Sequence, residues 1–211
     1  MAVAFPIPLA QFSDRLVIDQ LTLFCPQLTA ESRTGGGQII RAAMGEPLWQ
    51  GEIRLKPLRP DCGRSVQAVL DLLGRPGASF LFSPKGYAGP AATAILSAVA
   101  ANNRDVTLSG LPAGTRIPAD AFLSFTYGSS PTRYAFHQVA FAATANGAGQ
   151  VTVEVSPIVR PGWTAGLTVQ LGRPVLQAMR RGRDPGALVY YRQARPSYRT
   201  GGAFEFIQKL V

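Results

Sequence analysis

The sequence contains few of the residues on which metal sites and most catalytic sites are built. Its 211 residues include one histidine, His137, and two cysteines, Cys25 and Cys62. A structural zinc site takes four Cys or His ligands, so these three residues, far apart in sequence, exclude one. Two cysteines do not make a disulfide framework, and we expect both to be reduced thiols. Any Ser-His-Asp triad would depend on His137, which we interpret as a packed or hydrogen-bonded strand residue.

Several functional motifs are also missing. There is no P-loop, no dinucleotide-binding glycine fingerprint and no nucleophile elbow, and the 12 acidic residues are scattered. The run Gly35–Gly37 precedes strand-like sequence rather than a helix, so we predict a flexible hairpin loop there instead of a phosphate site. The sequence therefore predicts no catalytic, cofactor-binding or metal-binding residues and no enzyme. No substrate is suggested for the enzymatic alternative.

Membrane and secretion signals are absent in the same way. No run of 18 apolar residues occurs, which predicts no membrane span. The first residues lack a basic group and contain Pro6 and Pro8, so we expect no signal peptide and synthesis in the cytoplasm.

The composition is that of a folded chain with little long helix. Hydrophobic residues make up 46% and charged residues 16%, which excludes intrinsic disorder. Glycine (22) and proline (17) together approach a fifth of the chain, and both interrupt helices. The length predicts one domain or two small ones.

Strand-like alternation dominates the first 87 residues. In the clearest run, Trp49, Gly51, Ile53 and Leu55 share one face, which is typical of a half-buried antiparallel strand. The full set of candidate strands here is Leu21–Cys25, Gln38–Met44, Leu48–Leu55 and Ala78–Phe82.

One helix is predicted near residues 64–73. Val66, Val69, Leu70 and Leu73 fall on one helical face. Asp61 is a candidate N-cap, and Gly74 followed by Pro76 provides a stop.

The segment 88–162 is rich in small residues and nearly uncharged, with short strands bounded by turn sequences. We predict a compact five-stranded barrel or sandwich there, inserted between 1–87 and 163–211, which together form a β-sandwich with one helix. The strands expected in 88–162 are Thr93–Ala100, Asp105–Ser109, Phe122–Tyr127, Arg133–Ala142 and Gln150–Ser156. Those expected in 163–211 are Leu167–Leu171, Pro174–Met179, Leu188–Arg192 and Ala203–Gln208. The predicted fold class is mainly β.

The positive charge is concentrated near the C-terminus. Of the net +9, residues 163–211 carry +6, against +2 for 1–87 and +1 for 88–162. Arginine and tyrosine are suited both to single-stranded nucleic acid and to protein interfaces, and we favour subunit contacts over specific nucleic-acid binding. The predicted interface arginines are Arg180, Arg181, Arg183, Arg192, Arg195 and Arg199.

Part of the middle segment resembles a small β module of tail proteins from long-tailed phages. The resemblance covers about a quarter of the chain, and it departs at Ala119-Asp120, where related modules more often have Gly-Asp. The matching stretches are Val106–Thr115, Ala119–Phe125, His137–Val139, Ala145–Val153 and Pro157.

With its flanks, the chain resembles the distal tail proteins of siphophages and of gene-transfer-agent-like particles. That family implies a hexameric ring in the virion, between the tail tube protein and the hub or tip proteins. It implies no catalytic residues and no cofactor. A tail hub or fibre-attachment protein is the alternative within this class. A nucleic-acid-binding accessory protein that uses the C-terminal Arg/Tyr cluster is the alternative outside it.

Overall fold

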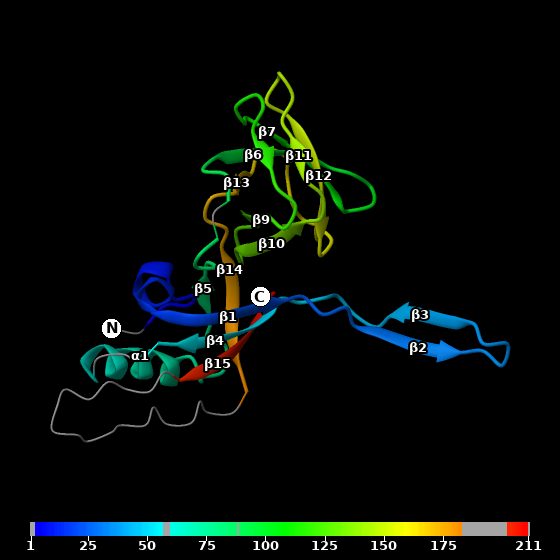
Figure 1. Cartoon of the computed structure of the whole chain (residues 1–211). Helices are drawn as coiled ribbons and strands as arrows, with labels where there is room; N and C mark the ends of the chain where they lie inside the picture. Colours follow the sequence, from blue (N-terminus) through cyan, green and yellow to red (C-terminus); the bar gives the residue numbers. More distant parts are fainter. Residues whose placement is uncertain (1–2, 57–59, 88, 183–201, 211) are drawn as a thin grey trace.

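The computed structural model describes residues 3–56, 60–87, 89–182 and 202–210, and the side chains of 60–62 are not among those described. The chain is mainly β, as predicted (Figure 1). Two larger sheets form the body, a curled sheet and a closed barrel, and two short two-stranded sheets accompany them.

The curled sheet is antiparallel throughout and has five strands. Their spatial order is β1 (Ile18–Phe24), β4 (Gln50–Leu55), β15 (Ala203–Gln208), β14 (Leu176–Arg181) and β5 (Phe80–Phe82). The N-terminal residue Ile7 bridges Phe80 at the β5 edge. The sheet therefore joins segments from both ends of the chain.

The helix α1 (Pro60–Leu72) and the short helices η1 (Leu9–Gln11) and η2 (Ser13–Arg15) provide the rest of this unit. Val66, Leu70 and Leu73 are buried in the same core as the sheet residues Ile53 and Phe206, which confirms the predicted apolar face. The predicted N-cap is wrong, because Asp61 lies inside the helix. Pro60 is the first helical residue, a position where proline's missing N–H is not needed.

The second sheet is a closed barrel. Its strands run in the order β10 (Arg133–Val139), β12 (Val151–Ser156), β7 (Asp105–Ser109), β6 (Thr93–Val99), β13 (Thr168–Gln170) and β9 (Phe122–Tyr127). A two-stranded sheet of β8 (Arg116–Ile117) and β11 (Ala143–Thr144) lies beside it. Alternate residues such as Val151, Val153 and Val155 fill the interior.

The barrel has six strands, not the five predicted, and extends beyond residue 162. The additional strand is β13, in which Val169 pairs with Ala94 of β6 and with Phe125 of β9. Val169 is fully buried, so this short strand fills the gap that would otherwise expose the interior. The predicted boundary at 162 therefore comes too early in the chain. The predicted strand Leu188–Arg192 lies outside the described residues.

Aromatic side chains hold the barrel against the curled sheet. Trp49 Nε1 donates a hydrogen bond to the carbonyl oxygen of Phe136 at 3.0 Å. The Trp49 ring packs edge-on against two phenylalanine rings. Its centroid lies 5.7 Å from that of Phe122 and 5.4 Å from that of Phe136. Tyr87 Oη accepts a hydrogen bond from the Phe122 N–H and donates one to its carbonyl. Both units thus contribute to one packed junction.

Gly51 offers a test of the packing in the curled sheet. A Cβ at this position would lie 2.5 Å from Phe206 Cζ and 2.6 Å from the Thr22 carbonyl oxygen. Because that oxygen belongs to the backbone, it moves only with its strand. We expect Gly51→Ala to lower the free energy of unfolding by about 1–3 kcal/mol, measured by urea denaturation. The control is Gly35→Ala: no atom lies within 4 Å of a Cβ at that position, so the free energy of unfolding should change little. Gly77 is not a suitable control position, because its φ is positive.

Candidate functional site

The single histidine is built into the protein interior. His137 is 3% exposed, and its Nδ1 lies 2.8 Å from the Pro157 carbonyl oxygen. Its ring stacks on the ring of Phe125, and the two ring centroids are 5.8 Å apart. Burial, assisted by the nearby Arg160 and opposed by the hydrogen bond to Pro157, lowers the pKa of His137 to about 4, so the ring is neutral at pH 7. The interpretation as a packed, hydrogen-bonded residue is confirmed.

The described residues show no cluster suited to metal binding. No group of three or more His, Cys, Asp or Glu side chains lies close enough to hold a metal ion within these ranges. Cys25 is a free thiol whose pKa burial raises to about 11, which makes it a poor nucleophile at neutral pH. Over the same part of the chain, no helix has the length and hydropathy to cross a membrane.

Two of the six predicted interface arginines are described, and they lie on opposite faces of the curled sheet. Arg180 Nη1 donates to the Leu70 carbonyl oxygen at 3.0 Å, near the end of α1, where carbonyls lack helical partners and the helix dipole favours a cation. Arg181 Nη1 donates to Gln50 Oε1. Arg180 thus has a structural contact within the chain, and the two do not form one patch.

The other four predicted interface arginines, Arg183, Arg192, Arg195 and Arg199, lie outside the described residues. Their place at a subunit boundary stays a prediction. Arg181 pairs across the strands with Glu205 and is exposed.

A two-stranded hairpin, which we call the arm, projects from the body (Figure 1). It consists of β2 (Thr29–Arg33), β3 (Ile39–Ala43) and the turn between them. Every residue of both strands is exposed, including Ile39 (48%) and Ile40 (52%). The predicted glycine hairpin loop is confirmed, with Gly37 at φ +85° in the turn.

The arm continues the hairpin formed by β1 and β4. Two prolines, Pro26 and Pro47, lie where the chain leaves and re-enters the curled sheet, and proline cannot donate a ladder hydrogen bond. The arm pairs with no other strand among those described. An isolated two-stranded hairpin is at best marginally stable in water, so this arm lacks the packing that its exposed apolar residues need.

A second unpaired feature lies next to the arm. The strand β1 is the last in the curled sheet, and within the described residues only β4 pairs with it. Its seven residues therefore present one free edge of backbone N–H and C=O groups. Phe24, at the end of β1 near the arm, is 48% exposed.

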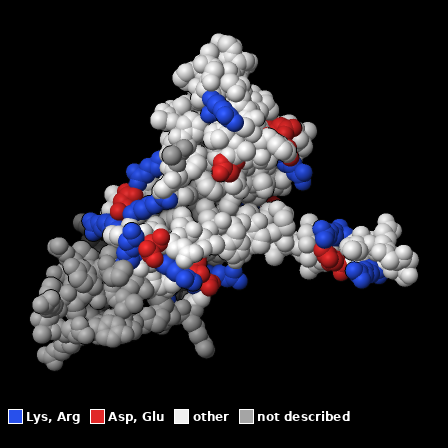
Figure 2. Space-filling model, in the orientation of Figure 1, with Lys and Arg blue, Asp and Glu red and all other residues white. Residues whose placement is uncertain are grey.

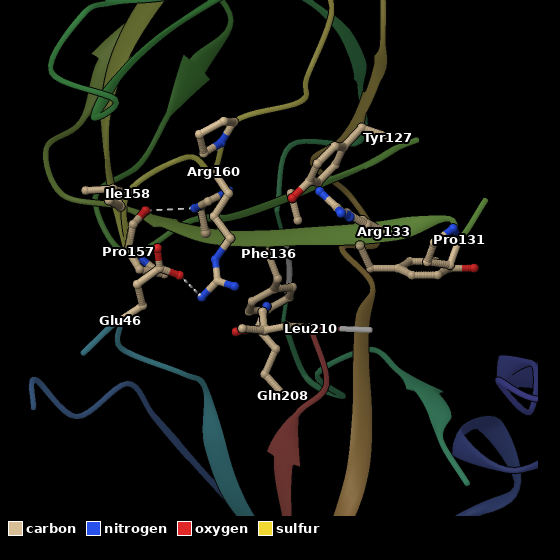
Figure 3. Close-up of a pocket in the computed structure, with 14 residues that line it drawn as sticks. Glu46, Tyr127, Pro131, Arg133, Phe136, Pro157, Ile158, Arg160, Gln208 and Leu210 are labelled. Atoms are coloured by element: carbon tan, nitrogen blue, oxygen red, sulfur yellow. Dashed lines mark hydrogen bonds and ion pairs between the residues drawn. The ribbon is translucent and has the colours of Figure 1, made fainter. Parts of the chain in front are cut away.

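Two cavities lie beside the barrel, the first between it, the end of β15 and Glu46, and the second between it and the base of the arm. The first has a volume of about 540 Å³ and is lined by Arg133, Arg160, Tyr127 and Tyr134, among others. The second, of about 600 Å³, shares Glu46, Pro157 and Ile158 with the first. Figure 3 shows the ion pair between Arg160 and Glu46 on one side of the first cavity and Arg133 beside Tyr127 on the other.

The Arg160–Glu46 ion pair, with a distance of 2.6 Å, connects the barrel to the base of the arm. Because the Glu46 side chain is 53% exposed, we expect Glu46→Gln to lower the free energy of unfolding by less than about 1 kcal/mol. The difference should shrink in 1 M salt. Urea unfolding at both salt concentrations checks this, with Glu31→Gln on the arm as the matched control, since Glu31 pairs with Arg41 away from the barrel.

The sequence pattern predicted one strand of the arm, β3 within Gln38–Met44, but neither β2 nor the departure of the arm from the curled sheet. The signal in the sequence was Pro26 and Pro47 on either side of the arm. It also did not single out Arg133 and Arg160, which are two of only four basic residues in 88–162.

Comparison with known proteins gives no family assignment: no protein-family model matches the chain, and no curated protein is significantly similar to it.

Proposed function

We propose that the protein is a structural subunit of the tail tip of a long-tailed phage, namely the distal tail ring that connects the tail tube to the tip or baseplate. The observation that carries the proposal is the arm, an exposed hairpin without a core of its own. The resemblance of the middle segment to a tail-protein module is the reason for proposing a phage tail as the assembly to which the subunit belongs.

The unpaired features support a ring rather than a symmetric dimer. The arm has free strand edges, and β1, which precedes the arm in the chain, has another at the end of the curled sheet. If the arm of one copy covers the β1 edge of the next, the two sides of the contact are unlike. Such a heterologous contact repeats around an axis and closes into a ring where the rotation permits. Strand pairing at free edges is a common means of protein association.

The surface charge is compatible with contacts between copies. Glu31, Arg33 and Arg41 give the arm both signs of charge, whereas the barrel surface in view is mostly uncharged (Figure 2). Because the arm carries both positive and negative side chains, it can form ion pairs with acidic or basic residues of a neighbouring subunit. The same contact can cover the apolar residues of the arm.

The test is the removal of the arm from the full chain. The N–H of Met44 donates to the Leu28 carbonyl oxygen at 2.7 Å, so residues 29–43 can be replaced by an Asn-Gly turn without straining the joint. We expect native mass spectrometry and electron microscopy to show six-fold rings for the full chain, alone or with its tail partners, and monomers for the armless variant.

Gly35→Ser, which alters the tip of the arm and keeps both strands, is the matched control and should still assemble. Thermal unfolding of the armless variant verifies that it is folded. Full chain that stays monomeric at every concentration, also with the tail tube and tip proteins, would contradict the proposal. A three-fold assembly would support the tail-hub alternative instead. Oligonucleotide binding that falls steeply with salt would support the nucleic-acid alternative.

A further inference from the structure

The barrel is closed at one seam by very few contacts. Strand β10 pairs with β9 over six residue pairs but with β12 over only two, Gln138 with Ser156 and Val139 with Val155. The strand β12 ends at Ser156, so the rest of β10 has no strand on that side within the described part of the chain. Five consecutive residues of β10, 133–137, line the 540 Å³ cavity.

The direction of the backbone groups along β10 follows from hydrogen bonds on both sides. The Val139 N–H donates to the Ala121 carbonyl on the β9 side, and the Ala140 N–H donates to Glu154 of β12. Backbone groups alternate in direction along a strand, so even-numbered residues of β10 face the β12 side. The hydrogen bond of Phe136 is consistent with this direction, because its carbonyl points away from β9 and accepts the Trp49 Nε1–H.

Tyr134 therefore directs its N–H and C=O groups toward the seam. No other described residue hydrogen-bonds to them. This leaves a short strand edge with a donor and an acceptor at a cavity, rather than inside the barrel ladder. Such an edge can take one additional strand.

The side chains around this edge favour an acidic occupant. The Arg133 guanidinium carbon lies 6.0 Å from the centroid of the Tyr127 ring, and no carboxylate in the described ranges forms an ion pair with it. Arg160 faces the same cavity with one nitrogen on Glu46. Arg133 lies beside the Tyr127 ring and has no carboxylate partner among the described residues (Figure 3). Its guanidinium is therefore available for a bidentate contact with a carboxylate.

We propose that this edge of β10 binds an extended peptide segment of a partner protein, with an acidic side chain of the segment on Arg133. The segment adds as a short strand along Tyr134 and covers Ile158, which is 37% exposed. The cavity volume is within the range of about 300–1,000 Å³ typical of binding sites. A small anion would use the arginine but not the free backbone edge. The site is separate from the arm and does not depend on ring formation.

The test uses the full chain and three capped pentapeptides as probes. The first alternates valine with glutamate, the second alternates valine with lysine, and the third is the first with N-methylated backbone amides. We expect chemical shifts of Arg133 and Tyr134 in NMR spectra to respond to the first peptide, and its affinity to exceed that of the other two at least tenfold.

Arg133→Gln should reduce the affinity for the glutamate peptide at least fivefold. The matched control is Arg116→Gln, since Arg116 is an exposed arginine on β8, beside the barrel, that does not line the cavity, and it should leave the affinity unchanged. Equal binding of the N-methylated peptide would overturn strand addition. Equal binding of the lysine peptide, or no binding of the glutamate peptide at millimolar concentration, would overturn the proposal. Ring formation is measured independently, so the two proposals fail separately.

Discussion

Trp49→Ala is expected to lower the free energy of unfolding by about 3–5 kcal/mol, the range for large aromatic truncations in a core. Trp49 is 2% exposed and lies where the curled sheet meets the barrel. Its truncation removes the ring contacts with Phe122 and Phe136 and leaves a cavity between the two units. It also leaves the Phe136 carbonyl without its indole donor.

The two contributions can be separated by a conservative variant. Trp49→Phe keeps most of the ring packing but loses the hydrogen bond to Phe136, so we expect a smaller loss of about 1–3 kcal/mol, the cost of a buried acceptor left unpaired. Phe141→Ala is the matched aromatic control, because Phe141 is 70% exposed and should change stability by less than about 0.5 kcal/mol.

Urea denaturation followed by far-UV circular dichroism measures all three variants. A loss below about 1 kcal/mol for Trp49→Ala would show that the junction contributes little to stability. The barrel and the curled sheet would then have to be treated as independently stable units.

Local sequence pattern was enough to predict most of the body of this protein. The alternation of Trp49, Gly51, Ile53 and Leu55 marks the buried face of β4 correctly, and the strand Ala203–Gln208 has the predicted bounds. Both follow from period-two burial, which depends on neighbours within a few residues. The helix could be located for the same reason, since its apolar residues repeat at helical spacing.

The sequence-based predictions fail where contacts between residues far apart in the sequence determine the structure. Three residues of β13 carry too little pattern to show that they close a barrel, and their partners are up to 77 residues away in sequence, as Gln170 is from Thr93. Arg180 reads as part of a basic cluster, yet the Leu70 carbonyl it contacts is 110 residues distant. The seam at β10 has no sequence signature at all, because it results from where β12 ends.

The arm shows a different limit of sequence reasoning. Ile39 and Ile40 are consecutive apolar residues of β3, yet both are exposed, and no other described strand pairs with the arm. A hydrophobic pattern records the final environment of a residue, including surfaces covered only in an assembly. This is why the pattern of the arm supports a proposal about partners.

The stability of the protein is expected to fall by roughly 3 kcal/mol on acidification because of His137 alone. The pKa of His137 is about 4 in the folded chain, against about 6.5 for an unperturbed histidine. Above pH 6.5 the ring is neutral in both states and contributes no pH dependence. Between about pH 6.5 and 4, the unfolded chain binds a proton that the folded chain does not, so the free energy of unfolding decreases as the pH falls.

The measurement compares the full chain with His137→Gln by urea denaturation from pH 7.5 to 4.5. Glutamine does not titrate, and its amide can still donate to the Pro157 carbonyl, which His137 Nδ1 contacts at 2.8 Å. Carboxylates contribute equally to both proteins, so the difference between the two curves isolates the histidine. We expect the advantage of the full chain over the variant to shrink by roughly 2–3 kcal/mol across this range. Parallel curves would mean that the imidazole takes up its proton within the folded barrel, and that the His137 site is less closed than its 3% exposure indicates.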